Sequence, residues 1–322
     1  RPHCYLVAPD VDDYVKAMLI KNNMTGITAT FAQFMDALNS MVPKTTFQLG
    51  QFILDADHAI KRKFSSSETL PVTTQAHLTA AYWYLDTEFV YPKTDGLTFF
   101  SGASEPFEGV GTELTFERDV EGELLALLLI DGEATIQSTS ITVVRGPAGS
   151  GKSILCQRLA KSLAQEKKPV LYLRPTNSLN PSELVELLSR IGEPLYLVVD
   201  NAADAMQHLQ DLVKRVRTLN QNLIIILAER TNEANAANLL EGLTVKRKVD
   251  LGEISRNEAK RLLNRLSDAN ALGQLAELSD YQRVETLIRA HGADGDLLVG
   301  IYRATYGADL EQMVVNEYER IP

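Results

Sequence analysis

The sequence contains few cysteines and no long apolar run. Its 322 residues include only two cysteines, Cys4 and Cys156, which lie far apart. This spacing favours a reduced compartment over a disulfide framework. The longest apolar runs, such as the one from Leu223 to Ala228, are far too short to cross a bilayer, and no secretory signal is recognisable. These absences lead us to expect a soluble, cytoplasmic protein.

Positive charge is also scarce. The 32 lysines and arginines are outnumbered by 42 acidic residues, so the formal net charge is −10 and no overall field favours nucleic acid or an anionic membrane. We expect neither as a partner, although a local basic groove is compatible with this balance. The length suffices for about two domains with a sizeable core. Because the chain begins with Arg1 rather than Met, we expect it to be a piece of something longer.

The most informative stretch is a glycine-rich turn between a β-branched run and a helix-forming segment. It fits G-x-x-x-x-G-K-[ST], the pattern of a phosphate-binding loop, at every fixed position. Glycines let the backbone approach a polyphosphate closely, and the amides of the loop and of the next helix's first turn face the anion. The residues predicted to hold the nucleotide here are Gly146, Pro147, Ala148, Gly149, Ser150, Gly151, Lys152, Ser153 and Ile154.

Two side chains of this loop have distinct predicted roles. Lys152 would reach the β- and γ-phosphates, and the Ser153 hydroxyl would bind Mg²⁺. The sequence therefore predicts a protein that binds a nucleoside triphosphate, with ATP or ADP and Mg²⁺ as cofactors.

Strands and helices alternate regularly from residue 139 onward. Apolar strands are expected at 141–145, 170–174, 195–200 and 223–228 and near 245–251, with amphipathic helices at 152–165, 181–191 and about 203–218. Near-continuous apolar strands between such helices predict a parallel sheet that is covered on both faces. The predicted fold class is α/β.

The strand at 195–200 ends in an acid, Asp200, as a Walker B strand does. Its carboxylate would lie at the carboxyl edge of the sheet and hold Mg²⁺ or its waters. A helix N-cap has the same sequence appearance, but the position one strand beyond a phosphate loop favours the metal-binding interpretation. Asp204, four residues further on, could act as the base that positions the attacking water, or could cap the next helix.

The order of the strands resembles one class of P-loop ATPases. A complete strand at 170–174 lies between the phosphate-loop strand and the Walker B strand, as in the additional-strand class that includes AAA+, RecA-like and STAND proteins. That class carries a polar sensor residue after the following strand, where this sequence has Arg230. A planar guanidinium is suited to contact a γ-phosphate. The alternative is a helix-capping ion pair with Glu229 or Glu233.

A second resemblance, to STAND ATPases, covers roughly residues 97–322. Residues 251–263 are similar to the L-x-x-L-S-x-x-E-A-x-x-L-L passage that opens the helical lid of that family, and Ser255 with Glu258 would form a capping box there. Residues 302–322 would supply the closing helices of the lid. The resemblance implies an ATPase core followed by a C-terminal helical lid.

Upstream of the phosphate loop, residues 96–120 form an aromatic and glycine-rich connection. In STAND proteins the corresponding segment lies over the adenine, and the resemblance assigns Arg118 to this place. A surface arginine paired with Glu117 or Asp119 is the open alternative. A leucine-rich helix from Val120 to Leu129 follows.

The N-terminal part alternates strand, helix, strand and helix over residues 1–43, with strands at 3–8 and 26–30 and helices at 14–22 and after Phe31. It resembles the C-terminal end of sirtuin-like domains of bacterial defence proteins. The residues that carry this resemblance are Pro2, His3, Val7, Ala8, Pro9, Asp12, Asp13, Phe31, Phe34, Met35 and Leu38. The NAD loop and catalytic histidine of a sirtuin are not in this sequence, so NAD hydrolysis would belong to a preceding domain.

Between these parts, residues 44–95 are predicted to be helical, over 47–63 and 74–88, with Trp83 in core packing. The predicted domains are 1–43, the end of a sirtuin-like domain; 44–95, a helical linker; 96–250, a P-loop nucleotide-binding domain; and 251–322, a helical lid.

The resemblances together imply the middle of a sirtuin–STAND antiviral defence protein. The leading hypothesis is a slow ATPase that acts as an ATP/ADP switch, assembles with copies of itself, and couples sensing of a phage-derived or other trigger to NAD⁺ destruction by the front domain. The alternative is a continuously cycling AAA+-type ATPase that remodels protein or nucleic-acid complexes, with an arginine finger from a neighbouring subunit. The strand order and the lack of an obvious acceptor site disfavour a metabolic kinase.

Overall fold

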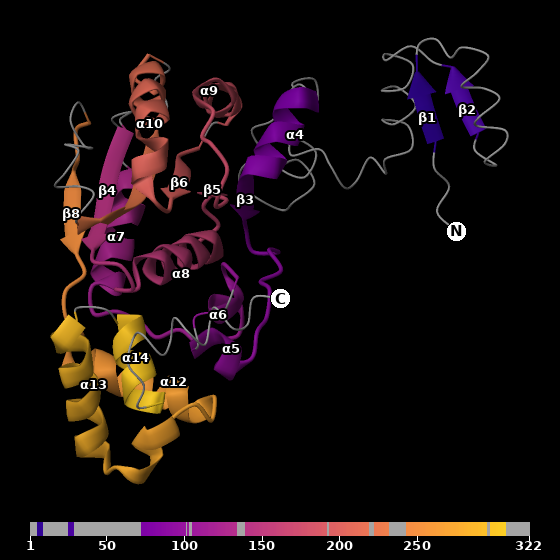
Figure 1. Ribbon diagram of the computed structural model, residues 1–322. Helices are drawn as coiled ribbons and strands as arrows, with labels where there is room; N and C mark the ends of the chain where they lie inside the picture. Colours follow the sequence, from indigo (N-terminus) through magenta and orange to yellow (C-terminus); the bar gives the residue numbers. More distant parts are fainter. Residues whose placement is uncertain are drawn as a thin grey trace.

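The computed structural model describes residues 5–8, 25–28, 72–100, 102, 105–133, 139–191, 193–218, 222–231, 243–294 and 297–306. Its centre is a six-stranded sheet with the strand order β3-β5-β6-β7-β4-β8 (Figure 1). The strands are β3 (Tyr82–Leu85), β4 (Thr139–Gly146), β5 (Val170–Leu173), β6 (Leu195–Val199), β7 (Leu223–Arg230) and β8 (Arg247–Asp250). Along the sheet from β5 through β6, β7 and β4 to β8, each strand is parallel to its neighbour, which confirms the predicted α/β fold.

The strand sequences explain this arrangement. Every residue of β5 and β6 is buried, as expected for strands that helices cover on both faces. Strand β8 alternates between half-buried and exposed residues because it lies at the edge of the sheet. In the centre, β4 pairs with β7 along its whole length, from Thr139 opposite Leu223 to Gly146 opposite Arg230.

One predicted element is wrong. Residues 74–88 do not form a single helix: α4 (Val72–Ala81) ends where β3 begins, and β3 pairs antiparallel with β5, with Tyr82 opposite Leu173. A Tyr-Trp-Tyr run favours a strand, and pairing with an apolar neighbour completes it. Residues 82–85 therefore belong to the sheet of the nucleotide-binding part and not to a helical linker, and the sheet is parallel except at this edge.

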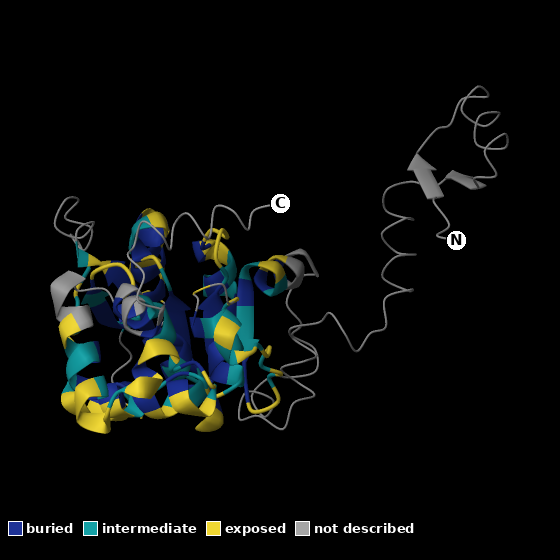
Figure 2. Ribbon diagram, turned by 60° about the horizontal axis from the view of Figure 1, so that its bottom comes forward, coloured by how far each residue is buried: buried dark blue, intermediate teal, exposed yellow. Residues whose placement is uncertain are grey.

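Helices cover both faces of the sheet, as predicted. On one face, α7 (Glu121–Glu133) and α8 (Lys152–Gln165) pack against side chains such as Tyr172, Tyr196 and Ile226. On the other face, α9 (Pro181–Arg190) and α10 (Ala202–Val216) pack against residues such as Leu197 and Ile225. The central strands β4 to β7 are consequently the most buried part of the molecule, whereas the outer faces of the helices are exposed (Figure 2).

An acidic side chain of α7 forms hydrogen bonds with the edge of the sheet at which β8 lies. Asp131, 5% exposed, accepts hydrogen bonds from Ser140 of β4 at 2.5 Å, from Lys246 at 2.6 Å and from two nitrogens of Arg247 of β8. Burial alone would raise the pKa of this carboxyl, but the hydrogen bonds from Arg247, Lys246 and Ser140 outweigh it and hold the pKa well below its ordinary value.

A helical lid follows the sheet, as the resemblance to STAND ATPases implies. Its elements are α12 (Arg256–Asp268), the short 3-10 helix η1 (Gly273–Glu277), α13 (Asp280–Asp294) and α14 (Leu297–Tyr306). They share a core with α5 (Gly96–Phe100) and lie below the sheet in Figure 1. The capping box of Ser255 and Glu258 is present at the start of α12, so that prediction is confirmed. Residues 307–322 lie outside the described residues.

Near the N-terminus, β1 (Tyr5–Ala8) and β2 (Thr25–Thr28) form a parallel pair, close to the two strands expected there. The helices predicted at 14–22, after Phe31 and at 47–63 lie outside the described residues. Within the described part of the chain, no helix is long and apolar enough to span a membrane.

Candidate nucleotide-binding site

The predicted phosphate-binding loop connects β4 to α8 and needs its glycines. Gly149 and Gly151 have φ angles of 66° and 88°, in the left-handed region that favours glycine. At Gly146 a Cβ atom would lie 2.6 Å from Ser150 Oγ and 3.0 Å from the carbonyl oxygen of Leu251, so no side chain fits. Because Gly151 is also the N-cap of α8 and has no side chain to bind the first amides, those donors remain for an anion.

Lys152 is held inside the loop. It is 8% exposed, and its ammonium donates to the carbonyl oxygen of Pro147 at 2.5 Å and to Ser150 Oγ at 3.4 Å. Both acceptors are neutral oxygens of the loop. A phosphate group in the loop would offer charged oxygens, which make stronger hydrogen bonds with an ammonium.

Seven predicted site residues line one polar cavity of about 610 Å³. They are Ala148, Gly149, Lys152, Ser153, Asp200, Asp204 and Arg230. The cavity lies beyond the carboxyl ends of β5, β6 and β7, the edge at which open α/β sheets bind their ligands. The structure thus brings together the residues that the sequence assigned to phosphate and metal contacts, and their individual roles stay predictions.

Asp200 directly follows β6, and its Oδ2 accepts a hydrogen bond from the Tyr172 hydroxyl at 3.3 Å. Burial and the Asp200 carboxylate raise the pKa of Tyr172 well above its ordinary value, so this phenol is neutral. Asp204 is exposed in the first turn of α10 and accepts from Asn201 Nδ2 at 2.5 Å. The N-cap of α10 is Asn201, so the capping alternative for Asp204 is wrong, and its role as a base stays a prediction.

The donor set fits Mg²⁺. Ser153 contributes a hydroxyl and Asp200 a carboxylate, both hard oxygen ligands on the wall of the same cavity. The described residues include no group of three or more His, Cys, Asp or Glu side chains arranged to hold a metal ion. Mg²⁺ is usually bound through one or two protein oxygens together with phosphate oxygens and water, so two ligands suffice. When bound, Mg²⁺ would neutralise phosphate charge in this cavity.

Arg230 ends β7 and lies opposite Gly146 of the phosphate-binding loop in the register of the sheet. Its side chain is exposed and lines the polar cavity. Glu229 and Glu233 were the alternative ion-pair partners of Arg230. Glu229 is buried and forms an ion pair with Arg145 at 3.5 Å, whereas Glu233 lies outside the described residues. The arrangement is compatible with a sensor of the terminal phosphate, which stays a prediction.

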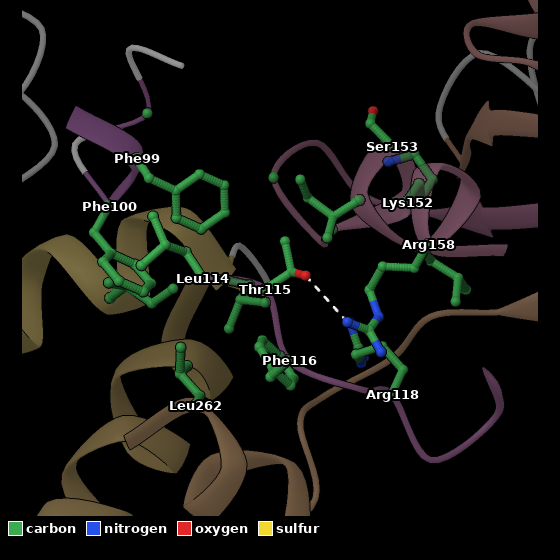
Figure 3. Close-up of a pocket in the computed structure, with 17 residues that line it drawn as sticks. Phe99, Phe100, Leu114, Thr115, Phe116, Arg118, Lys152, Ser153, Arg158 and Leu262 are labelled. Atoms are coloured by element: carbon green, nitrogen blue, oxygen red, sulfur yellow. Dashed lines mark hydrogen bonds between the residues drawn. The ribbon is translucent and has the colours of Figure 1, made fainter. Parts of the chain in front are cut away.

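A second cavity, of about 370 Å³ and mostly apolar, lies on the other side of the loop (Figure 3). Its apolar lining comes from α8, from the segment before α7 and from the lid. Ile154, a predicted site residue, and Leu155 belong to α8. The others are Phe99, Phe100, Leu114, Phe116, Leu262, Leu297 and Ile301. Arg158 of α8 also lines it and donates to Thr115 Oγ1 at 3.1 Å, the bond drawn in Figure 3. Aromatic and aliphatic walls with a few polar groups suit a nucleobase. Of the apolar residues that line this cavity, only Ile154 was predicted from the sequence as part of the site.

Arg118 lies in this apolar cavity but is not a surface residue. It is 6% exposed, its Nε donates to Glu258 Oε1 at 2.8 Å, and its Nη1 donates to the carbonyl oxygen of Ser150 at 2.9 Å. The alternative of a surface pair with Glu117 or Asp119 is therefore wrong. A contact of Arg118 with adenine stays a prediction.

The partner of Arg118 belongs to a larger connection between the lid and the core. Glu258 Oε1 also accepts from the Asp119 amide at 2.8 Å, and Oε2 accepts from the Ser255 amide at 3.0 Å. Asp119 accepts in turn from Ser255 Oγ at 2.6 Å and from Arg261. These hydrogen bonds from Ser255 and Arg261 lower the pKa of Asp119. The start of α12 is thus bound through Glu258 and Arg118 to the phosphate-binding loop.

Three solved structures illustrate what the chain resembles. Cdc6p from Pyrobaculum aerophilum is 14% identical with a TM-score of 0.42, and the match covers 66% of this chain and 65% of that one. Domain III of the Thermotoga maritima replication initiation protein DnaA is 15% identical with a TM-score of 0.37, covering 65% and 95%. The E. coli MS115-1 HORMA:CdnC:Trip13 complex contains a chain 12% identical, with a TM-score of 0.38 and coverage of 63% and 87%.

No curated protein gives a significant match to the sequence. A family model does match, over residues 97–239, which is fewer than half of the residues of the chain. The matched segment contains the phosphate-binding loop, Asp200 and Arg230, and the match supports a nucleotide-dependent ATPase. The segment around the two cavities is therefore similar to the family described as Novel STAND NTPase 5.

Proposed function

We propose that this chain is the ATP-binding switch of a STAND-type defence protein. ATP would bind with its triphosphate in the phosphate-binding loop, its base in the apolar cavity and its terminal phosphate toward the polar cavity. Hydrolysis would be slow and would return the switch to its starting state.

One observation carries this proposal: Gly149, Lys152 and Ser153 line both cavities. A nucleotide held by the loop can therefore contact the sheet edge on one side and the lid on the other. Because Leu262, Leu297 and Ile301 of the lid line the apolar cavity, a base bound there would favour one packing of lid against core.

The terminal phosphate provides the difference between ATP and ADP that a switch requires. Lys152, Arg230 and the Mg²⁺ ligands Ser153 and Asp200 would all contact the γ-phosphate or its metal ion, and ADP would forgo these contacts. A ligand shifts a conformational equilibrium only by its differential affinity for the two states, so these side chains set the size of the response.

The defence role rests on the resemblances of the sequence. We propose that nucleotide-dependent assembly with further copies of the chain couples a phage-derived or other trigger to an NAD-depleting domain in front of residue 1. The similarity of residues 97–239 to a STAND NTPase family supports the switch, and the sirtuin-like pattern of residues 1–43 supports the effector.

The test begins with the nucleotide that co-purifies with the chain, identified after denaturation, and continues with single- and multiple-turnover ATP hydrolysis. The variant Lys152→Ala removes the phosphate-binding ammonium, and Lys214→Ala, on the exposed side of α10, is the matched control. We expect tightly held nucleotide, turnover on the order of minutes, and loss of binding only in Lys152→Ala.

Two results would contradict the switch. An empty site with turnover near or above about one per second would favour a continuously cycling remodelling ATPase. Nucleotide binding that is absent, or that is unaffected by Lys152→Ala, would overturn both functions.

A further inference from the structure

A buried tyrosine hydroxyl contacts the candidate Mg²⁺ ligand Asp200. The Tyr172 hydroxyl of β5 donates to Asp200 Oδ2 at 3.3 Å, and Asp200 directly follows the neighbouring strand β6. The contact therefore joins two strands at the edge of the sheet where the polar cavity lies.

The direction of this bond is determined by its acceptor. An ionised carboxylate can only accept hydrogen bonds, and a neutral phenol has a single hydrogen to donate. That hydrogen goes to the carboxylate of Asp200.

The phenol cannot easily take another position. Tyr172 is 1% exposed, and its ring packs edge-on against Phe107 with centroids 4.9 Å apart and lies 6.0 Å from Trp83. A buried hydroxyl without its acceptor would carry a desolvation cost, so the packing favours the Asp200 contact.

We propose that Tyr172 is the positioning residue of the metal site: its hydroxyl holds Asp200 by Oδ2 and leaves Oδ1 for the metal ion or its waters. This inference rests on the proposed nucleotide and Mg²⁺ binding. Second-layer partners of a ligating carboxylate fix its orientation, and their loss weakens metal binding without removing a ligand.

The chain offers a matched control for the hydroxyl. Tyr196 lies on the neighbouring strand β6, is 0% exposed, packs in the same core and donates its hydroxyl to the carbonyl oxygen of Leu128 at 3.2 Å. Tyr172→Phe and Tyr196→Phe each remove one buried, hydrogen-bonded hydroxyl and leave the ring. They differ in whether the lost acceptor is the candidate metal ligand.

The experiment measures Mn²⁺ binding to the whole chain with ATP bound, from the loss of the free-ion signal in electron paramagnetic resonance, beside ATP affinity in the presence of EDTA. We expect Tyr172→Phe to weaken Mn²⁺ binding about tenfold, with metal-free ATP affinity unchanged, and Tyr196→Phe to bind Mn²⁺ like the wild type. Circular dichroism checks that each variant is folded.

Equal Mn²⁺ affinity in wild type and Tyr172→Phe would overturn the inference while leaving the proposed function intact. Equal losses in Tyr172→Phe and Tyr196→Phe would overturn it as well, because a general effect of core hydroxyls would then explain both. A wild-type chain that takes up neither ATP nor Mn²⁺ would overturn the proposed function and this inference together.

Discussion

Removing either member of the ion pair between Arg118 and Glu258 should destabilise the protein strongly. Their side chains are 7% and 6% exposed, and the pair joins residues 140 positions apart. Arg118→Ala would leave the Glu258 carboxylate buried without its cation, and Glu258→Ala would leave the guanidinium buried without its anion. Breaking a buried pair in this way costs about 3–5 kcal/mol.

Each substitution also removes further hydrogen bonds. Arg118→Ala deprives the Ser150 carbonyl of a donor at 2.9 Å, and Glu258→Ala removes the acceptor of the Asp119 and Ser255 amides. Since the central ion pair can be lost only once, the double variant should cost less than the sum of the single variants. We expect a coupling free energy of about 2 kcal/mol.

The assay is urea unfolding of the whole chain, followed by circular dichroism and by the fluorescence of Trp83, the single tryptophan. Arg215→Ala is the control, because Arg215 pairs with Asp211 at 2.9 Å while both side chains are about half exposed. The loss of an exposed pair should change the free energy of unfolding by less than about 1 kcal/mol. If Arg118→Ala costs no more than Arg215→Ala, or if the Arg118 and Glu258 effects simply add, our reasoning about the lid connection is wrong.

Four further predictions concern single side chains. Asp131 has a lowered pKa in the fold, so its contribution to stability is present at neutral pH and is lost as the pH falls below about 4. Measured by urea unfolding, Asp131→Asn should therefore lose less stability between about pH 6 and about pH 3 than the wild type does, and an equal loss would contradict this. Phe116→Ala should weaken ATP binding about tenfold but leave binding of inorganic triphosphate unchanged, since base stacking is worth about 1–3 kcal/mol; calorimetry would compare the two ligands. Asp204→Asn should lower single-turnover hydrolysis about a hundredfold if the carboxylate is a base, whereas unchanged turnover would remove it from the mechanism. Gly273→Ala should make the lid more sensitive to limited proteolysis, because φ is 51° and the new Cβ would lie 1.9 Å from the Thr305 carbonyl oxygen; equal cleavage rates would refute the clash.

Features that depend on local sequence were predicted well. The helix predicted at 152–165 has these bounds in the structure, and the strands from β4 to β8 agree within a few residues. Apolar strand runs, the glycine-rich loop and the capping box of Ser255 and Glu258 are all patterns within a short stretch of chain, and they needed no knowledge of distant contacts. The position of Asp200 at the carboxyl edge of the sheet followed from them, because parallel strands end at the same edge.

Features that depend on distant contacts could not be predicted in this way. The Tyr-Trp-Tyr run becomes a strand because it meets the buried edge of β5, which begins 85 residues after the end of β3 in sequence. Arg118 was expected beside adenine or beside its neighbours in sequence, but its partner Glu258 lies on another element. Tyr172 appeared to be one more apolar residue of a strand, because its hydroxyl meets the Asp200 carboxylate only when β5 and β6 pair in the sheet.

Strand β3 also determines how short a fragment of this protein can be made. The family match begins at residue 97, which would be an obvious first residue for a minimal nucleotide-binding fragment. Such a fragment would lack β3 and leave β5, four buried residues in sequence, as an open edge of the sheet. Exposed apolar edge strands pair with other chains and promote aggregation. A fragment that starts before α4, at or upstream of Val72, keeps this edge covered and should remain in solution where the shorter one precipitates.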